Sequence, residues 1–158
     1  MPSTAKVDLS PLPAVGEPDG SAPGVPAEAG ETHRLPGVLA SAASARRLVE
    51  RFLFRLGRIE LVESATLVAS ELVTNAVTHG RPPVHLDLSW SADGGRATLR
   101  LDVHDHGRIA LHAVDRHSDD EAECGRGLLV VDHLATRWGL TPHPVHGTRA
   151  WAEITAAG

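Results

Sequence analysis

The chain has 158 residues, of which 42% are hydrophobic and 22% are charged, a length and balance typical of one globular domain. Its formal net charge of −5 argues against a general affinity for nucleic acid, which needs a basic surface to neutralise phosphates. No apolar run approaches the roughly 20 residues that span a bilayer, and no basic region followed by a hydrophobic one opens the chain, so we expect a cytoplasmic protein that does not bind membranes.

The first segment in chain order has the composition of a tail. Six of the eleven prolines fall within residues 1–32, together with glycine, serine, alanine and acidic residues and without a sustained apolar period. This composition is typical of disorder. A short extended segment is possible between Thr32 and Val38. We therefore expect a disordered tail over residues 1–32 and one domain over residues 33–158.

Two helices are predicted next. Apolar residues at helical spacing favour a first helix over residues 41–57, which ends at Gly57, and a second over residues 59–79, which ends at Gly80. Glu71 and Asn75 stand four residues apart in the second helix, so both side chains lie on one face. Carboxylate and amide oxygens there suit general-base chemistry and magnesium coordination. The alternative is that both are ordinary solvated helix positions.

The period then changes from helical to two. Alternating apolar residues predict a strand over residues 84–90, a turn at Asp93-Gly94-Gly95 and a returning strand. Continuing the alternation of the returning strand brings Asp105 to the inward face. An inward carboxylate normally needs a hydrogen-bonding partner, either in the protein or in a ligand. The alternative is a solvated Asp-x-Gly turn formed with Gly107.

A stretch of weak periodicity over residues 108–123 is too long for a plain connection and is typical of a lid or a disordered loop. Gly125-Arg126-Gly127 follows and reads as a glycine-rich loop that opens a helix over residues 128–138, with Gly139 just past its end. Such loops expose backbone N–H groups where phosphates bind well. On its own this pattern is weak evidence, because it is shorter than a dinucleotide fingerprint. A closing strand is predicted over residues 145–155.

Four motifs in this order resemble those of the histidine-kinase-like ATPase family. They are Glu71-x-x-x-Asn75, Asp105-x-Gly107, Gly125-Arg126-Gly127-Leu128, and Gly147-Thr148 at the start of the last strand. Within the family, the chain looks most like the small bacterial anti-sigma-factor serine/threonine kinases, and the resemblance covers residues 33–156. It departs at Ile109, where a second glycine is usual, and in the last motif, where many relatives have Gly-Lys and this chain has Gly147-Thr148-Arg149.

The resemblance implies an α/β two-layer sandwich, in which a mixed, mostly antiparallel sheet is covered on one face by helices, with ATP and Mg²⁺ as cofactors. The implied roles concern catalysis, metal binding, the adenine and the phosphates. They are Glu71 as catalytic base, Asn75 as magnesium ligand, Asp105 as acceptor for the adenine amino group, Gly107 as the position where the backbone passes the base, Gly125, Arg126, Gly127 and Leu128 as the phosphate loop, and Thr148 as support for the adenine end.

Three functions follow from this set. The first is a kinase that binds a sigma factor and phosphorylates a small anti-sigma-factor antagonist on a hydroxyl. The second is a non-catalytic module whose ATP state gates partner binding. The third is a fragment of a histidine kinase, which would need a helix pair with an acceptor histidine, and the proline-rich tail is unsuited to supply one. A homodimer is expected by resemblance.

Overall fold

The computed structural model describes residues 26–107, 121–143 and 147–156, with side chains 121–125 and 143 outside the description. Its elements, in order, are β1 (Glu28–Leu35), α1 (Ser41–Arg55), the 3₁₀ turn η1 (Ile59–Leu61), α2 (Val62–His79), β2 (Val84–Asp93), β3 (Arg96–Asp105), α3 (Glu121–Leu134), β4 (Arg137–His143) and β5 (Gly147–Ala156). Within these ranges no helix is long and apolar enough to cross a membrane.

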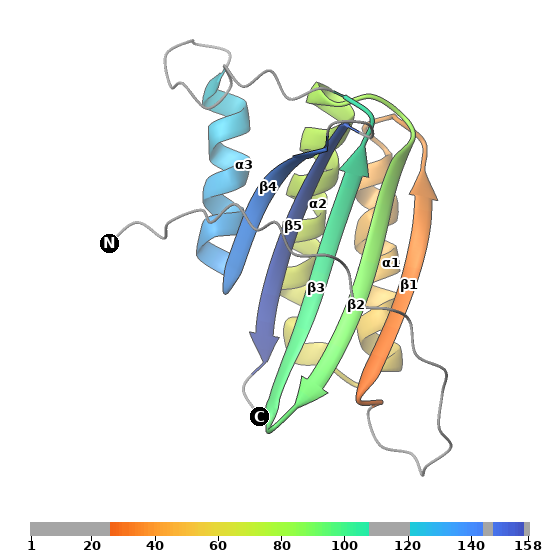
Figure 1. Ribbon diagram of the computed structural model, residues 1–158, viewed down its shortest axis with the longest axis vertical. Helices are drawn as coiled ribbons and strands as arrows, with labels where there is room; N and C mark the ends of the chain where they lie inside the picture. Colours follow the sequence, from red (N-terminus) through yellow and green to blue (C-terminus); the bar gives the residue numbers. More distant parts are fainter. Residues whose placement is uncertain (1–25, 108–120, 144–146, 157–158) are drawn as a thin grey trace.

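The five strands form one sheet in the order β1-β2-β3-β5-β4, and every pairing between neighbours is antiparallel. The three helices lie on one face of this sheet and leave the other face without a helix (Figure 1). The predicted fold class, a two-layer α/β sandwich with helices on one face, is therefore confirmed, with a described sheet that is antiparallel throughout.

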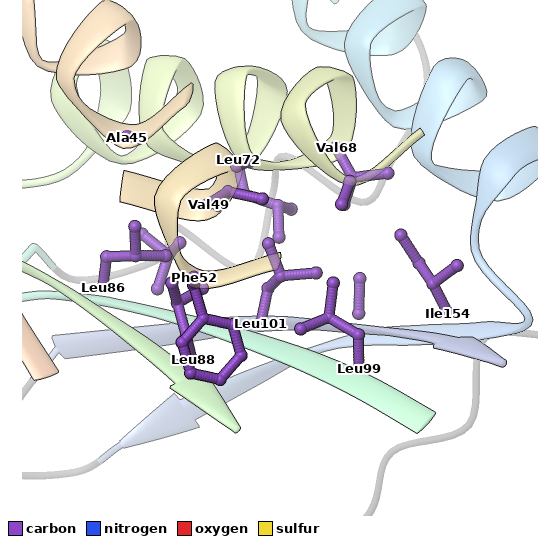
Figure 2. Packing of buried hydrophobic residues seen from close by; sticks show 14 of the residues in the cluster. Ala45, Val49, Phe52, Val68, Leu72, Leu86, Leu88, Leu99, Leu101 and Ile154 are labelled. Carbon is purple, nitrogen blue, oxygen red and sulfur yellow. The ribbon is translucent and has the colours of Figure 1, made fainter. Parts of the chain in front are cut away.

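The hydrophobic core lies between the sheet and helices α1 and α2. Alternate strand residues point into it, as Figure 2 shows for Leu86, Leu88, Leu99 and Leu101. Helical residues three and four apart meet them from above, among them Val49, Phe52, Val68 and Leu72, all at most 2% exposed. Burying this aliphatic layer is the main favourable contribution to folding.

Both predicted helix ends and the predicted hairpin are confirmed. Gly57 follows α1 with a φ of 66°, a left-handed conformation that suits glycine after a helix. Gly80 follows α2, although residues 59–61 of that predicted helix form the separate turn η1. Gly94 and Gly95, with φ values of 56° and 80°, turn the chain between β2 and β3.

The predicted boundary of the tail at residue 32 is wrong. Strand β1 begins at Glu28, so residues 28–32 belong to the sheet and pair with Asp87–Ser91 of β2. The apolar alternation fails here because two of the residues that face the helices are polar. Glu31 and His33 are hydrogen-bonded to each other at 2.8 Å, and Arg55 of α1 is ion-paired with Glu31. Residues 1–25 of the predicted tail lie outside the described residues.

The predicted helix over residues 128–138 is also wrong at both ends. Helix α3 begins at Glu121 and ends at Leu134, so Gly125-Arg126-Gly127 lies inside a helix and not in a loop that opens one. Residues 137–143 form strand β4, which the sequence analysis missed. Gly139 is a strand residue: a Cβ there would lie 2.9 Å from Nε1 of Trp151 on β5, so glycine makes room for the indole. Residues 108–120 of the predicted lid lie outside the described residues.

Candidate functional site

Glu71 and Asn75 lie on the same face of α2, one turn apart, and both are half-buried beside the fully buried Leu72 and Ala76. This face is the edge of α2 that borders α3. The arrangement agrees with the predicted polar stripe, because neither side chain is fully exposed to solvent as the alternative of ordinary solvated positions would require. His79, at the end of the helix, is exposed.

Helix α3 packs directly on this stripe through Gly127. A Cβ on Gly127 would overlap Oε2 of Glu71 and would lie 3.4 Å from its Cδ. Glycine therefore permits the close approach of the two helices at the position of the carboxylate. The structure thus brings the predicted base and the predicted phosphate segment together. Arg126 is exposed and Leu128 is half-buried next to this contact, and Gly125 belongs to the same helix.

Asp105 lies at the end of β3 and is 5% exposed. Its Oδ1 accepts hydrogen bonds from the backbone N–H groups of Gly107 at 2.6 Å and Arg81 at 3.4 Å. Burial raises the pKa of this carboxyl above its ordinary value, and the two backbone hydrogen bonds only partly oppose that shift. The inward position predicted from the strand alternation is correct, and the alternative of a solvated turn is not.

Three glycines surround Asp105. A Cβ on Gly80 would overlap its carboxyl group, and one on Gly107 would lie 2.9 Å from its Oδ1. Gly147 has a φ of 92°, and a Cβ there would overlap the Asp105 carbonyl oxygen. Backbone at Gly80 and Gly107 therefore approaches the carboxylate, and Gly147 approaches the backbone of Asp105, at distances that no other residue type allows.

Thr148 pairs with Asp105 across β5 and β3 and lies on the same side of the sheet. Its Oγ1 donates a hydrogen bond to the Gly107 carbonyl oxygen at 3.4 Å. The neighbouring Arg149 points to the opposite, helix-free face, where it is ion-paired with Asp102 at 2.6 Å. The predicted proximity of Thr148 to Asp105 is therefore present, and Arg149, the next residue of the last motif, lies outside this site.

Helix α2 connects the two clusters. Its end at Gly80 touches Asp105, and Glu71 lies nine residues earlier, about 13 Å along the helix axis at 1.5 Å per residue. Asn75 stands between them. The Asp105 carboxyl beside the C-terminal end of α2 and the Glu71 carboxylate near its middle therefore belong to two clusters on one helix.

The sequence analysis missed two contributors to this site. Gly80 was interpreted only as a helix stop, and the backbone N–H of Arg81 was not considered. The sequence does hold one indication of this role, because a glycine, and not a residue with a side chain, stands between the polar stripe and the Pro82-Pro83 pair. Which atom that glycine approaches depends on the pairing of β3 with the α2–β2 connection, where His106 N donates to Arg81 O at 2.9 Å.

The site offers the side-chain oxygens of Glu71 and Asn75 on α2 and the carboxyl of Asp105 at the end of β3. Among the described residues, no group of three or more His, Cys, Asp or Glu side chains could hold a metal ion alone. Mg²⁺ usually takes only one or two protein oxygens and completes its shell with phosphates and water, so Asn75 and Glu71 are compatible with it. At Asp105 the backbone of Gly80 and Gly107 packs against the carboxyl, so no side chain of these residues lies beside it. The residues present therefore fit a magnesium nucleotide.

The fold and these motifs define a nucleotide-binding α/β domain. The profile of the histidine kinase-like ATPase domain matches residues 35–148, well over half of the chain. The chain belongs to the histidine kinase-like ATPase family, and membership implies an ATP-binding domain. No curated protein matches the chain significantly.

Proposed function

We propose that this protein is an ATP-dependent serine/threonine kinase that phosphorylates a small anti-sigma-factor antagonist in the cytoplasm, and that it binds a sigma factor in alternation with that substrate. The observation that supports the proposal best is that α2 carries Glu71 near its middle, against Gly127 of α3, and ends at Gly80 beside the Asp105 carboxyl. The partners and a homodimeric state are proposed from the resemblance to the anti-sigma-factor kinases.

The Asp105 end has the chemistry of an adenine site. A carboxylate can accept a hydrogen bond from the exocyclic amino group of adenine, and the backbone at Gly80 and Gly107 places no side chain next to it. Oδ1 is already engaged by two N–H groups, and these hydrogen bonds fix the orientation of the carboxylate. Oδ2 has no hydrogen bond among the described residues and is the atom we assign to the amino group.

The Glu71 end has the chemistry of phosphoryl transfer. Bound Mg²⁺ neutralises charge on the phosphates, and the Asn75 side-chain oxygen would hold it. Glu71 would accept the proton of the acceptor hydroxyl as that oxygen attacks the terminal phosphorus of ATP, and the bond from that phosphorus to the bridging oxygen would break to release ADP. Arg126, Gly127 and Leu128 of α3 would then border the phosphates. Positioning and charge stabilisation dominate such reactions, so the placement of Glu71 matters more than its basicity.

A second candidate is the ATP-gated interaction module. The contact between Glu71 and Gly127 favours it, because α3 occupies the space beside the carboxylate that an acceptor hydroxyl would need. In that function, nucleotide would change the position of α3 and so alter a partner surface, without transfer.

The two candidates are separated by incubating purified protein and its Glu71→Gln variant with γ-labelled ATP, Mg²⁺ and extract from the source cells. Both proteins should first be shown to bind ATP equally. The kinase proposal predicts label on a serine or threonine of a small protein with the unchanged chain and at least a hundredfold less with the variant. Equal ATP binding with no label in either reaction would support the interaction module.

A further inference from the structure

The face of the sheet that carries no helix is built from polar and charged residues (Figure 1). Most of its ions are paired. Arg100 contacts Asp102 at 2.9 Å and Glu153 at 2.7 Å, and Arg137 contacts Glu153 at 2.6 Å. Arg100 also lies over the indole of Trp151 at 4.5 Å, which leaves that ring 5% exposed. The centre of this face is therefore internally satisfied.

One row across the same face is different. The strand register aligns Arg34 of β1 with His85 of β2, His85 with His104 of β3, and His104 with Arg149 of β5. Side chains in direct register share a face. At about 4.8 Å between strands, the four side chains form a line of roughly 14 Å, which we call the cationic row. His106, just beyond β3, adds a further imidazole 6.3 Å from that of His85.

The counter-charges of the cationic row are incomplete. His104 contacts Asp87 at 3.1 Å, and Arg149 contacts Asp102 at 2.6 Å, both acids from the next row. Arg34 is exposed and has no hydrogen bond or ion pair within the described residues. The row thus ends in an unneutralised guanidinium in a chain whose net charge is −5.

An apolar pocket continues from this end of the row. Arg34 lines it together with Leu35, Pro36, Gly37, Pro82 and Pro83, and the open pocket has a volume of about 560 Å³. Val38 and Leu39, which follow directly, are 52% and 67% exposed. A cationic line beside an apolar pocket suits a ligand with acidic groups on one side and one apolar group at its end.

We propose that the cationic row and the proline-lined pocket bind an acidic segment of a partner polypeptide that carries an apolar anchor residue. Opposite charge on the ligand matches the Arg34 guanidinium, for which the described residues supply no carboxylate, and the pocket is large enough for one aliphatic side chain. A nucleic acid is disfavoured because Trp151, the only tryptophan or phenylalanine that the described strands place on this face, is covered by Arg100. This surface lies on the face opposite the Glu71 stripe, so the proposal does not depend on kinase activity.

The test uses the full chain and a fluorescein-labelled peptide of alternating glutamate and glycine with one terminal leucine, followed by fluorescence anisotropy. Arg34→Gln should weaken binding about threefold and Arg34→Gln/His85→Gln about tenfold. Arg96→Gln, the same change at the exposed opposite end of β3, is the matched control and should leave affinity unchanged. Replacing the leucine of the peptide by alanine should weaken binding about fivefold.

Three results would overturn the proposal. One is equal peptide affinity of Arg34→Gln and the unchanged chain. Another is an affinity for a single-stranded oligonucleotide of the same charge that is greater than for the peptide and equally sensitive to Arg34. The third is a dimer in sedimentation that Arg34→Gln dissociates, since the face would then be covered by a second copy of this chain.

Discussion

Glu71 on α2 and Gly127 on α3 are in contact, and no side chain larger than hydrogen fits between them. The carboxylate proposed as catalytic base is therefore held by the same helix that carries the phosphate motif. This relationship makes a direct prediction for a substitution that leaves both polar side chains in place.

Gly127→Ala should separate activity from stability. The added methyl meets the flexible end of Glu71, which can rotate away, and alanine favours a helix over glycine by about 1 kcal/mol. The free energy of unfolding in urea should thus stay within about 1 kcal/mol of the unchanged chain. Phosphotransfer should fall at least tenfold because the carboxylate is displaced. Loss of folding would show that the contact between Glu71 and Gly127 is structural. Unchanged phosphotransfer would show that the position of the Glu71 carboxylate does not affect the reaction.

Gly80→Ala should behave in the opposite way. The methyl would overlap the backbone carbonyl of Ala76 as well as the Asp105 carboxyl, and neither can move without disturbing α2 or β3. We expect a loss of about 3 kcal/mol in the free energy of unfolding. Gly30→Ala is the matched control, since its methyl would lie 3.4 Å from the Leu88 carbonyl oxygen, an ordinary contact. Similar urea midpoints for the two variants would contradict the close approach at Gly80.

Asp105→Asn should change the pH dependence of stability with a defined sign. Burial raises the pKa of Asp105 in the folded state, so between about pH 4 and that raised pKa the folded chain binds more protons than the unfolded chain. The free energy of unfolding of the unchanged chain therefore falls as the pH rises through this window. The asparagine variant lacks this loss because its side chain does not ionise. The stability of the variant minus that of the unchanged chain should increase from pH 4 upward and then level off. If the difference in stability decreased with pH instead, the two backbone hydrogen bonds would stabilise the carboxylate by more than burial destabilises it.

Asp102→Asn should destabilise the sheet. Asp102 is 5% exposed and bridges Arg100 of its own strand and Arg149 of β5. Removing its charge leaves the half-buried Arg149 guanidinium without a carboxylate and Arg100 with Glu153 alone, which costs about 3 kcal/mol in such settings. Asp93→Asn, at the exposed hairpin, should change the free energy of unfolding by less than about 0.5 kcal/mol because asparagine suits turns equally well. Equal free energies of unfolding of the two variants in chemical denaturation would show that water solvates the arginines when the Asp102 carboxylate is removed.

The sequence predicted the parts of the fold that depend on local pattern. The alternation from Val84 to Trp90, the Asp93-Gly94-Gly95 turn and the inward position of Asp105 follow from period two and turn chemistry, and all are present. The apolar spacing of α1 and α2 likewise requires only the residues of each helix.

The parts that failed depend on contacts between distant segments. Strand β1 presents Glu31 to the helices because Arg55 neutralises it, and β4 contains Gly139 because Trp151 lies against it. In the same way, glycines 125 and 127 signal a loop when taken alone, whereas Gly127 is helical because α2 lies next to it. At the candidate site, the motif residues were found from spacing, but the approach of Gly80 to Asp105 required the tertiary structure.

The measurement that tests the central claim most directly is the affinity for ATP and for GTP, in the presence of Mg²⁺, of the unchanged chain and Asp105→Asn, by isothermal titration calorimetry. Adenine recognition by the Asp105 carboxylate predicts clear preference for ATP and a loss of at least tenfold in ATP affinity in the variant, with Glu71→Ala retaining the original affinity. Equal affinity of Asp105→Asn and the unchanged chain for ATP would contradict the assignment of Asp105 as the adenine contact.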